Sequence, residues 1–213
     1  MREPASSRNR CKPGMTLIEI LVVIAIIGTL AALSYPSLKK GINSANRAKC
    51  LGNLKLIGIA AEQFTQDSDN TFPPVDYWPD RLSVYLIDPR YAANLPPNTK
   101  TVFWCPSAVP ADLGTAYNGN VAYAINAQGY AGLKRFQETS SDGKQVITNS
   151  RRIAFTDGNS ANMWDTTPQR LPAWHGDCFN ALFADSHAES VLTNQFPPGS
   201  TAWRNLLWGY KRY

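Results

Sequence analysis

Two histidines and several acids near the C-terminus are the residues of this sequence whose types could support metal chemistry. They are His175, Asp185 and His187, with Asp157 and Asp177 as further acids. Imidazole and carboxylate groups bind Zn²⁺ and related metals, so a metal site, and with it a metal hydrolase, is one interpretation. The simpler interpretation, which we favour, is structural. Asp185 would cap a hairpin turn, and His175 would donate a hydrogen bond that holds the preceding loop.

No motif of a known enzyme class accompanies these residues. The sequence lacks G-x-S-x-G, a Walker loop, H-E-x-x-H, a glycine-rich dinucleotide fingerprint and Cys-x-x-Cys. Asp157-Gly-Asn-Ser is a turn sequence first, and a calcium loop is the weaker alternative because its acids are sparse. We therefore expect no enzymatic activity and no cofactor, with calcium as the alternative.

A further acid, Glu19, lies inside an apolar run from Met15 to Tyr35. The 21 residues of this run would form a helix roughly 30 Å long, which matches a bilayer core. A carboxylate there costs about 2.5–3.5 kcal/mol unless it is paired, and no basic residue lies between Met15 and Leu38. Cleavage after Gly14 would create a partner, the α-amino group of Met15. Pairing between neighbouring helices would then fix their axial register.

The net charge is concentrated ahead of this run. The chain has 213 residues, 44% hydrophobic and 17% charged, with a net charge of +5. This composition excludes wholesale disorder, a collagen-like fibre and a polytopic membrane protein. Residues 1–14 hold four basic residues and one acid, so they carry +3 of that charge. The rest of the chain, at +2, makes no case for a nucleic-acid partner.

A basic segment before an apolar run also fits a secretory signal peptide, but this run exceeds the ~7–15 apolar residues usual there. Gly14-Met15-Thr-Leu-Ile-Glu19-Ile instead resembles the leader and cleavage site of type IV pilins and type II secretion pseudopilins. That family has Glu at the fifth mature position and often Pro at the twenty-second, which Glu19 and Pro36 match when counted from Met15. Family members usually begin with Phe, where this chain has Met15. The resemblance implies that a prepilin peptidase cleaves after Gly14 and N-methylates Met15.

Three further stretches resemble one branch of pilin-like proteins, found in multiple copies in planctomycetes, verrucomicrobia and their relatives. They are Cys50-Leu-Gly-Asn-Leu-Lys, Phe103-Trp-Cys105-Pro-Ser and the segment from His175 to Asp185. The branch carries a C-terminal H-x9-D-G signature, in which Ser186 replaces the glycine. This replacement argues against a positive φ at that turn position, which glycine adopts most readily.

The resemblance implies a structural subunit of a type IV pilus or type II secretion-like filament. Its partners would be identical or related pilin subunits, the prepilin peptidase, an inner-membrane assembly platform and membrane lipid. Before assembly the chain would cross the inner membrane once, with its C-terminal domain extracytoplasmic. It would then join a filament in the periplasm or at the cell surface. The alternative is a membrane-anchored extracytoplasmic module that binds glycan or metal and never polymerises.

The expected fold is α+β and pilin-like, a long N-terminal helix packed on an antiparallel β-sheet. We divide the chain into a leader (1–14), a transmembrane and assembly helix (15–36), the membrane-distal half of the helix (37–66) and an extracytoplasmic β-rich domain (67–213). The face of the helix that should meet the sheet carries apolar residues at helical spacing, namely Cys50, Leu54, Ile57, Ala61 and Phe64.

Strands are predicted from short runs bounded by turn residues, at 121–125, 145–148, 152–156, 180–184 and 187–192. The last two are expected to pair as a hairpin. The stretches 67–118 and 157–172 are expected to be loop-rich.

Cysteine usage bears on the extracytoplasmic domain. Removal of a leader that contains Cys11 would leave Cys50, Cys105 and Cys178. An odd number allows at most one intrachain disulfide, with three pairings open. Because Cys50 lies on the helix face that should meet the sheet, we favour a Cys50–Cys105 disulfide.

Overall fold

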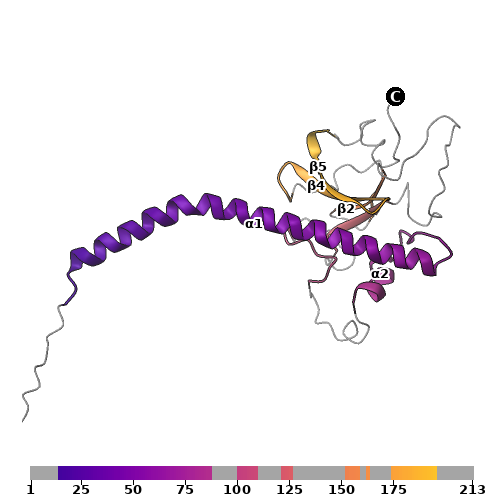
Figure 1. The fold of residues 1–213 in the computed structure, drawn as a ribbon, viewed down its shortest axis with the longest axis horizontal. Coiled ribbons are helices and arrows are strands. Elements are labelled where there is room, and N and C mark those ends of the chain that lie inside the picture. The colour runs from indigo at the N-terminus through magenta and orange to yellow at the C-terminus, as the bar shows by residue number, and fades with distance from the viewer. Residues whose placement is uncertain are drawn as a thin grey trace, which may run out of the picture. The chain divides into compact units, whose positions relative to one another are not determined.

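The computed structural model of the chain describes residues 14–87, 100–109, 121–126, 152–158, 162–163 and 174–195. The chain divides into two compact units, Met1–Ile42 and Asn43–Tyr213. Helix α1 (Leu17–Asp67) begins in the first unit and ends in the second (Figure 1). The predicted α+β class is therefore confirmed, with one long N-terminal helix and a sheet in the second unit.

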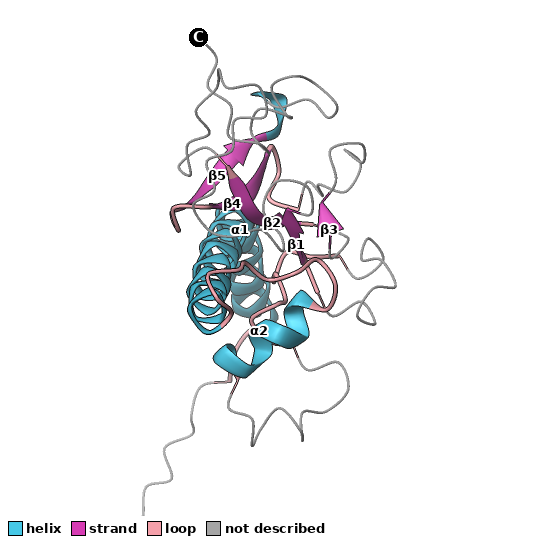
Figure 2. Cartoon of the chain, turned by 90° about the vertical axis from the view of Figure 1, so that its right-hand side faces the viewer, coloured by secondary structure: helices cyan, strands magenta, loops and turns pink. Residues whose placement is uncertain are grey.

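The part of α1 in the second unit packs against the sheet through the predicted face. Its buried apolar residues include Cys50, Leu54, Ile57 and Ala61, and Phe64 is partly buried against the same core. The opposing side chains come from three neighbouring strands and are Tyr123, Ile125, Phe155 and Leu182. Figure 2 shows the strands lying across this part of the helix.

Within the described residues the sheet has five strands, β1 (Tyr123–Asn126), β2 (Ile153–Asp157), β3 (Asn162–Met163), β4 (Cys178–Phe183) and β5 (Ala188–Leu192). Their order is β3-β1-β2-β4-β5, which can be followed across Figure 2. The pairs β1–β2, β2–β4 and β4–β5 are antiparallel. The two-residue strand β3 pairs in parallel with β1, an addition to the antiparallel sheet that we expected.

Four of the predicted strands correspond to β1, β2, β4 and β5, with bounds that shift by one or two residues. The predicted strand at 145–148 lies outside the described residues. All residues of β1, β2 and β4 are buried, whereas β5 has one buried, two half-buried and two exposed residues. β5 is the last strand in the sheet order, which is consistent with its partial exposure.

The β4–β5 hairpin turns through Ser186, whose φ is +70°. Our expectation from the missing glycine was therefore wrong. Local hydrogen bonds hold the turn, because the Ser186 amide donates to the Phe183 carbonyl (2.9 Å) and the His187 amide donates to Asp185 Oδ1 (3.2 Å). The Ser186 hydroxyl also donates to Glu62 Oε1 on α1 (3.2 Å).

Helix α2 (Trp78–Leu86) lies in the stretch that we expected to be loop-rich, so that expectation is corrected. Trp78 and Leu82 are fully buried, and the Trp78 ring packs on Phe103 and Phe155 with centroid separations of 5.6 and 5.1 Å. A proline in the first turn and apolar residues four positions apart were readable signals. They were obscured because the helix has only 9 residues and follows several turn formers.

Helix α1 approaches the sheet closely at Gly58 but not at Gly52, so alanine at these two positions should affect stability differently. A Cβ at Gly58 would lie 2.7 Å from Leu182 Cδ2, whereas a Cβ at Gly52 would meet nothing within 4 Å. We expect Gly58→Ala to lower the free energy of unfolding by about 1–2 kcal/mol, since overpacking exceeds the gain in helix propensity. The control, Gly52→Ala, should raise it by about 0.5–1 kcal/mol. Equal stabilities in denaturant titrations would mean that Leu182 moves aside without cost.

Candidate functional site

The first candidate site is the N-terminal segment, defined as Gly14–Ile42. Every residue in it is exposed. Gly14 and Met15 precede the first turn of α1, so the bond between them lies outside regular structure, and Pro36 lies within the helix. Unfolding of a helix is therefore not needed for a peptidase to reach the Gly14–Met15 bond.

Glu19 is held at the start of α1 by Thr16. Glu19 Oε2 accepts hydrogen bonds from the Thr16 amide (2.7 Å) and the Thr16 hydroxyl (2.8 Å), and the Glu19 amide approaches Thr16 Oγ1 at 3.4 Å. This reciprocal arrangement is a capping box, which satisfies amides that would otherwise lack partners. We did not predict a role for Thr16, although Thr-x-x-Glu ahead of an apolar run is a readable signal for it.

The rest of the N-terminal segment presents apolar side chains on all sides. Among the described helices, α1 alone is long and apolar enough to cross a membrane, with a mean hydropathy of 2.6 over an 18-residue stretch. None of that stretch is buried within the chain. Such a surface needs a lipid or protein environment, because exposed apolar area of this extent is unfavourable in water.

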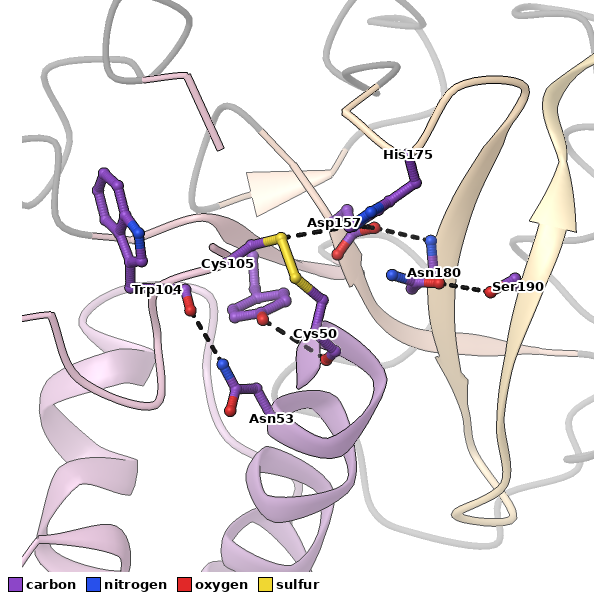
Figure 3. The surroundings of a disulfide bond; sticks show 9 residues. Cys50, Asn53, Trp104, Cys105, Asp157, His175, Asn180 and Ser190 are labelled. Atoms are coloured by element: carbon purple, nitrogen blue, oxygen red, sulfur yellow. Dashed lines mark hydrogen bonds and ion pairs between the residues drawn. A yellow bond between two sulfur atoms is a disulfide. The ribbon is translucent and has the colours of Figure 1, made fainter. Parts of the chain in front are cut away.

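The second candidate site is the disulfide cluster, defined as Cys50, Cys105, Asp157 and His175 (Figure 3). Cys50 of α1 and Cys105 of the 100–109 segment form a disulfide, the pair that we favoured from the sequence. His175 Nε2 lies 3.4 Å from Cys105 Sγ and 3.3 Å from Asp157 Oδ2. The side chains of His175 and Asp157 are 1% and 0% exposed.

Neighbouring contacts hold the 100–109 segment between α1 and β1. Asn53 of α1 donates to the Trp104 carbonyl (2.9 Å), and the Ala122 amide donates to the Phe103 carbonyl (2.9 Å). The Tyr123 hydroxyl faces the Cys50 carbonyl at 3.5 Å. The disulfide is thus one of several attachments that fix this segment on the helix.

Asp157 is the most constrained acid in the cluster. Its Oδ2 accepts a hydrogen bond from the Asn180 amide (2.8 Å), while Oδ1 has no hydrogen-bond partner among the described residues. Burial raises the pKa of Asp157 above its usual range, and His175 and Asn180 act in the opposite direction. The Asp157 carboxylate is fully buried at the end of β2, and of the turn sequence that follows it only Gly158 lies within the described residues.

A chain of polar contacts continues from Asn180 across the sheet to α1. The Ser190 hydroxyl donates to Asn180 Oδ1 (2.6 Å), and Arg47 Nε donates to Ser190 Oγ (2.7 Å). Together with the Asn180–Asp157 bond, these contacts link α1, β5, β4 and β2 to the disulfide cluster (Figure 3 shows the part from Ser190 onward). This path of contacts begins at Arg47 of α1 and returns to the same helix at Cys50, through the disulfide.

The structure does not bring the predicted metal-binding residues together. His175 precedes β4 and faces Asp157, whereas Asp185 and His187 follow β4 and contact each other at the exposed hairpin turn. A six-residue strand separates the two places by about 20 Å. In the part of the chain that the structure describes, the group of three or more metal-ligating side chains with converging atoms is Cys50, Cys105 and His175.

Comparisons with known proteins match part of the chain. A family model described as "Prokaryotic N-terminal methylation motif" matches residues 9–35. Over 62 residues the chain is 39% identical to "Type IV major pilin protein PilA" of Myxococcus xanthus, which covers 29% of this chain and 27% of that protein. No solved structure matches the chain.

Two further relatives carry the name "Type II secretion system core protein G". The chain is 36% identical over 61 residues to that of Pseudomonas aeruginosa, or 29% of this chain and 43% of that protein. It is 31% identical over 75 residues to that of Aeromonas hydrophila, or 35% and 52%. The chain therefore spans about half or less of the length of these relatives.

Proposed function

We propose that this chain, whose N-terminal region is that of a type IV pilin or type II secretion pseudopilin, is a structural subunit of a filament. The N-terminal segment carries the proposal, because its apolar side chains are exposed all round and contain one acid at the position that the family uses. Copies of this segment can bury one another's apolar surface once they leave the bilayer. We assign the chain no catalytic role.

Processing is the first proposed step. A prepilin peptidase cuts between Gly14 and Met15 and methylates the new amine, while the apolar run keeps the precursor in the inner membrane. The exposed position of both residues ahead of α1 supports this step. The second unit lies outside the cytoplasm, where an oxidising environment is compatible with the Cys50–Cys105 disulfide.

Assembly is the second proposed step. On the membrane platform, the Met15 amine of one subunit pairs with Glu19 of a neighbour, which neutralises two charges and sets the register of the helices. Thr16 holds the Glu19 carboxylate in the single subunit and so limits the cost of an unpaired acid before assembly. The resulting filament lies in the periplasm or at the cell surface.

Imaging of native filaments tests this function most directly. We expect antibodies against the second unit to label filaments, and mass spectrometry of those filaments to recover the chain starting at N-methylated Met15. The proposal fails if the chain is recovered from membranes only as a monomer after crosslinking, with no labelled filament.

Replacement of Gly14 provides a separate prediction about processing. We expect Gly14→Val to leave the precursor uncut, because a branched side chain then stands next to the bond to be cleaved. The intact mass of the membrane-bound chain would therefore retain the leader. The matched control is Met15→Phe, which introduces the residue that family members usually have and should be cut normally. Normal cleavage of the Gly14 variant would contradict the assigned processing site.

A further inference from the structure

The disulfide cluster has the composition of a metal site as well as of a covalent link. Cys50 Sγ, Cys105 Sγ and His175 Nε2 all lie within 4.8 Å of one another. Asp157 Oδ2 lies 3.3 Å from the same imidazole nitrogen. Two sulfurs, one imidazole and one carboxylate are a ligand set that Zn²⁺ accepts in tetrahedral sites.

Two of the distances among these atoms are those of a tetrahedral zinc site. With Zn–N and Zn–O near 2.0–2.2 Å and Zn–S near 2.3 Å, neighbouring ligand atoms lie about 3.3–3.8 Å apart. The Cys105 Sγ–His175 Nε2 distance of 3.4 Å and the His175 Nε2–Asp157 Oδ2 distance of 3.3 Å already have these values. The two sulfurs would have to separate, which reduction of their bond allows, and the Asp157 carboxylate would have to move closer to them, because it is not among the atoms that lie within 4.8 Å of one another.

The buried carboxylate is an independent reason to expect a cation. Asp157 is fully buried, and its Oδ1 has no hydrogen-bond partner within the described residues. An ionised carboxylate in such a place is costly unless it is paired or coordinates a metal. In Figure 3 the His175 side chain points toward Asp157 and toward the sulfur of Cys105.

We infer that the dithiol form of this chain binds one Zn²⁺ ion through Cys50, Cys105, His175 and Asp157. A phosphine or dithiol reductant supplies two electrons and the disulfide takes up two protons to give two thiols. Zn²⁺ then displaces both thiol protons to solvent and binds the thiolates. A small-molecule disulfide, itself reduced to two thiols, accepts the two electrons of the thiolates, which re-forms the Cys50–Cys105 bond and releases the metal. The same 100–109 segment is thus held on α1 by zinc in one redox state and by a covalent bond in the other.

Cobalt substitution on the full-length chain in detergent tests this inference. The protein is reduced with a phosphine under anaerobic conditions, and Co²⁺ is added as a spectroscopic probe for Zn²⁺. We expect thiolate-to-cobalt charge-transfer bands, tetrahedral d–d bands, and one equivalent of metal per chain that Zn²⁺ displaces. The oxidised wild-type chain, whose two sulfurs are joined in the disulfide, should bind no metal at this site. Absence of binding by the reduced chain would overturn the inference.

Variants separate this site from other metal-binding side chains. Cys50→Ala with Cys105→Ala should abolish the charge-transfer bands. His175→Ala should weaken metal binding more than loss of a residue that only supports a ligand, which costs about 10–100-fold in affinity. Circular dichroism of the oxidised His175 variant checks that it folds. The matched control, Asp185→Ala with His187→Ala, removes the exposed pair at the hairpin and should leave binding unchanged. Loss of binding in that control, or retention of it in the cysteine variant, would contradict the assignment.

Discussion

Replacement of Glu19 by alanine is expected to abolish incorporation of the chain into filaments while leaving cleavage and membrane insertion intact. The charge pair with the neighbouring Met15 amine would be lost, and the amine would remain buried without a partner. Breaking a buried pair in this way costs about 3–5 kcal/mol, or roughly 100- to 5,000-fold in association. Insertion should persist, because the change removes a charge from an apolar run. The measurement is the ratio of filament-bound to membrane-bound chain.

Thr16 makes it possible to separate charge pairing from helix capping. Thr16→Ala removes the hydroxyl hydrogen bond to Glu19 but keeps the carboxylate. It should cost the helix start about 0.5–2 kcal/mol and reduce assembly only modestly. Thr29→Ala is a control in the same helix, since its hydroxyl bonds to the Ile26 carbonyl (2.8 Å). An equal defect in the Thr16 and Glu19 variants would show that capping, rather than pairing, accounts for the effect.

Removal of the disulfide is expected to have the largest effect on stability. Cys50 and Cys105 are separated by 55 residues, and closing a loop of that length stabilises the fold by about 4 kcal/mol in the chain-entropy model. The variant Cys50→Ala with Cys105→Ala should therefore melt about 8–16 °C lower. Melting of the full-length chain in detergent, followed by near-ultraviolet circular dichroism with a metal chelator present, measures the difference.

Chemical reduction provides the control for this variant. A phosphine should lower the melting temperature of the wild-type chain to about that of the double variant and should not change the variant further. The chelator is needed because a metal bound to the free thiols would restore part of the stability. A double variant that melts at the wild-type temperature would mean that hydrogen bonds such as Asn53–Trp104 hold the segment unaided.

Features that repeat along the chain could be predicted from the sequence. The face of α1 that meets the sheet carries apolar residues at helical spacing, so Leu54 and Ile57 are buried as expected. Helix α2 was missed because it is too short to display a convincing period. The parallel pairing of β3 could not be predicted either, since two residues carry no period at all.

The disulfide cluster depends on contacts that no local pattern contains. Asp157 and His175 meet because the β2–β4 pairing places the end of β2 beside the Asn180 amide. From the sequence we favoured the Cys50–Cys105 pair. We grouped His175 with Asp185 and His187 because these residues lie close to it in the chain. Strand β4 lies between His175 and the pair Asp185 and His187, so residues that are close in the sequence are far apart in the structure. The role of Thr16, by contrast, is contained in a local pattern, since Thr-x-x-Glu ahead of an apolar run is the signature of a capping box.

The closed loop made by the disulfide has a mechanical consequence for a subunit that bears tension. Force that enters through α1 passes from Cys50 directly to Cys105 and bypasses the residues between them, which include all of α2. The bypassed contour of 55 residues corresponds to about 180–200 Å of extended chain. While this disulfide is intact, the segment between the two cysteines cannot be extended by a force applied along the chain. Reduction of the disulfide would allow the segment to extend.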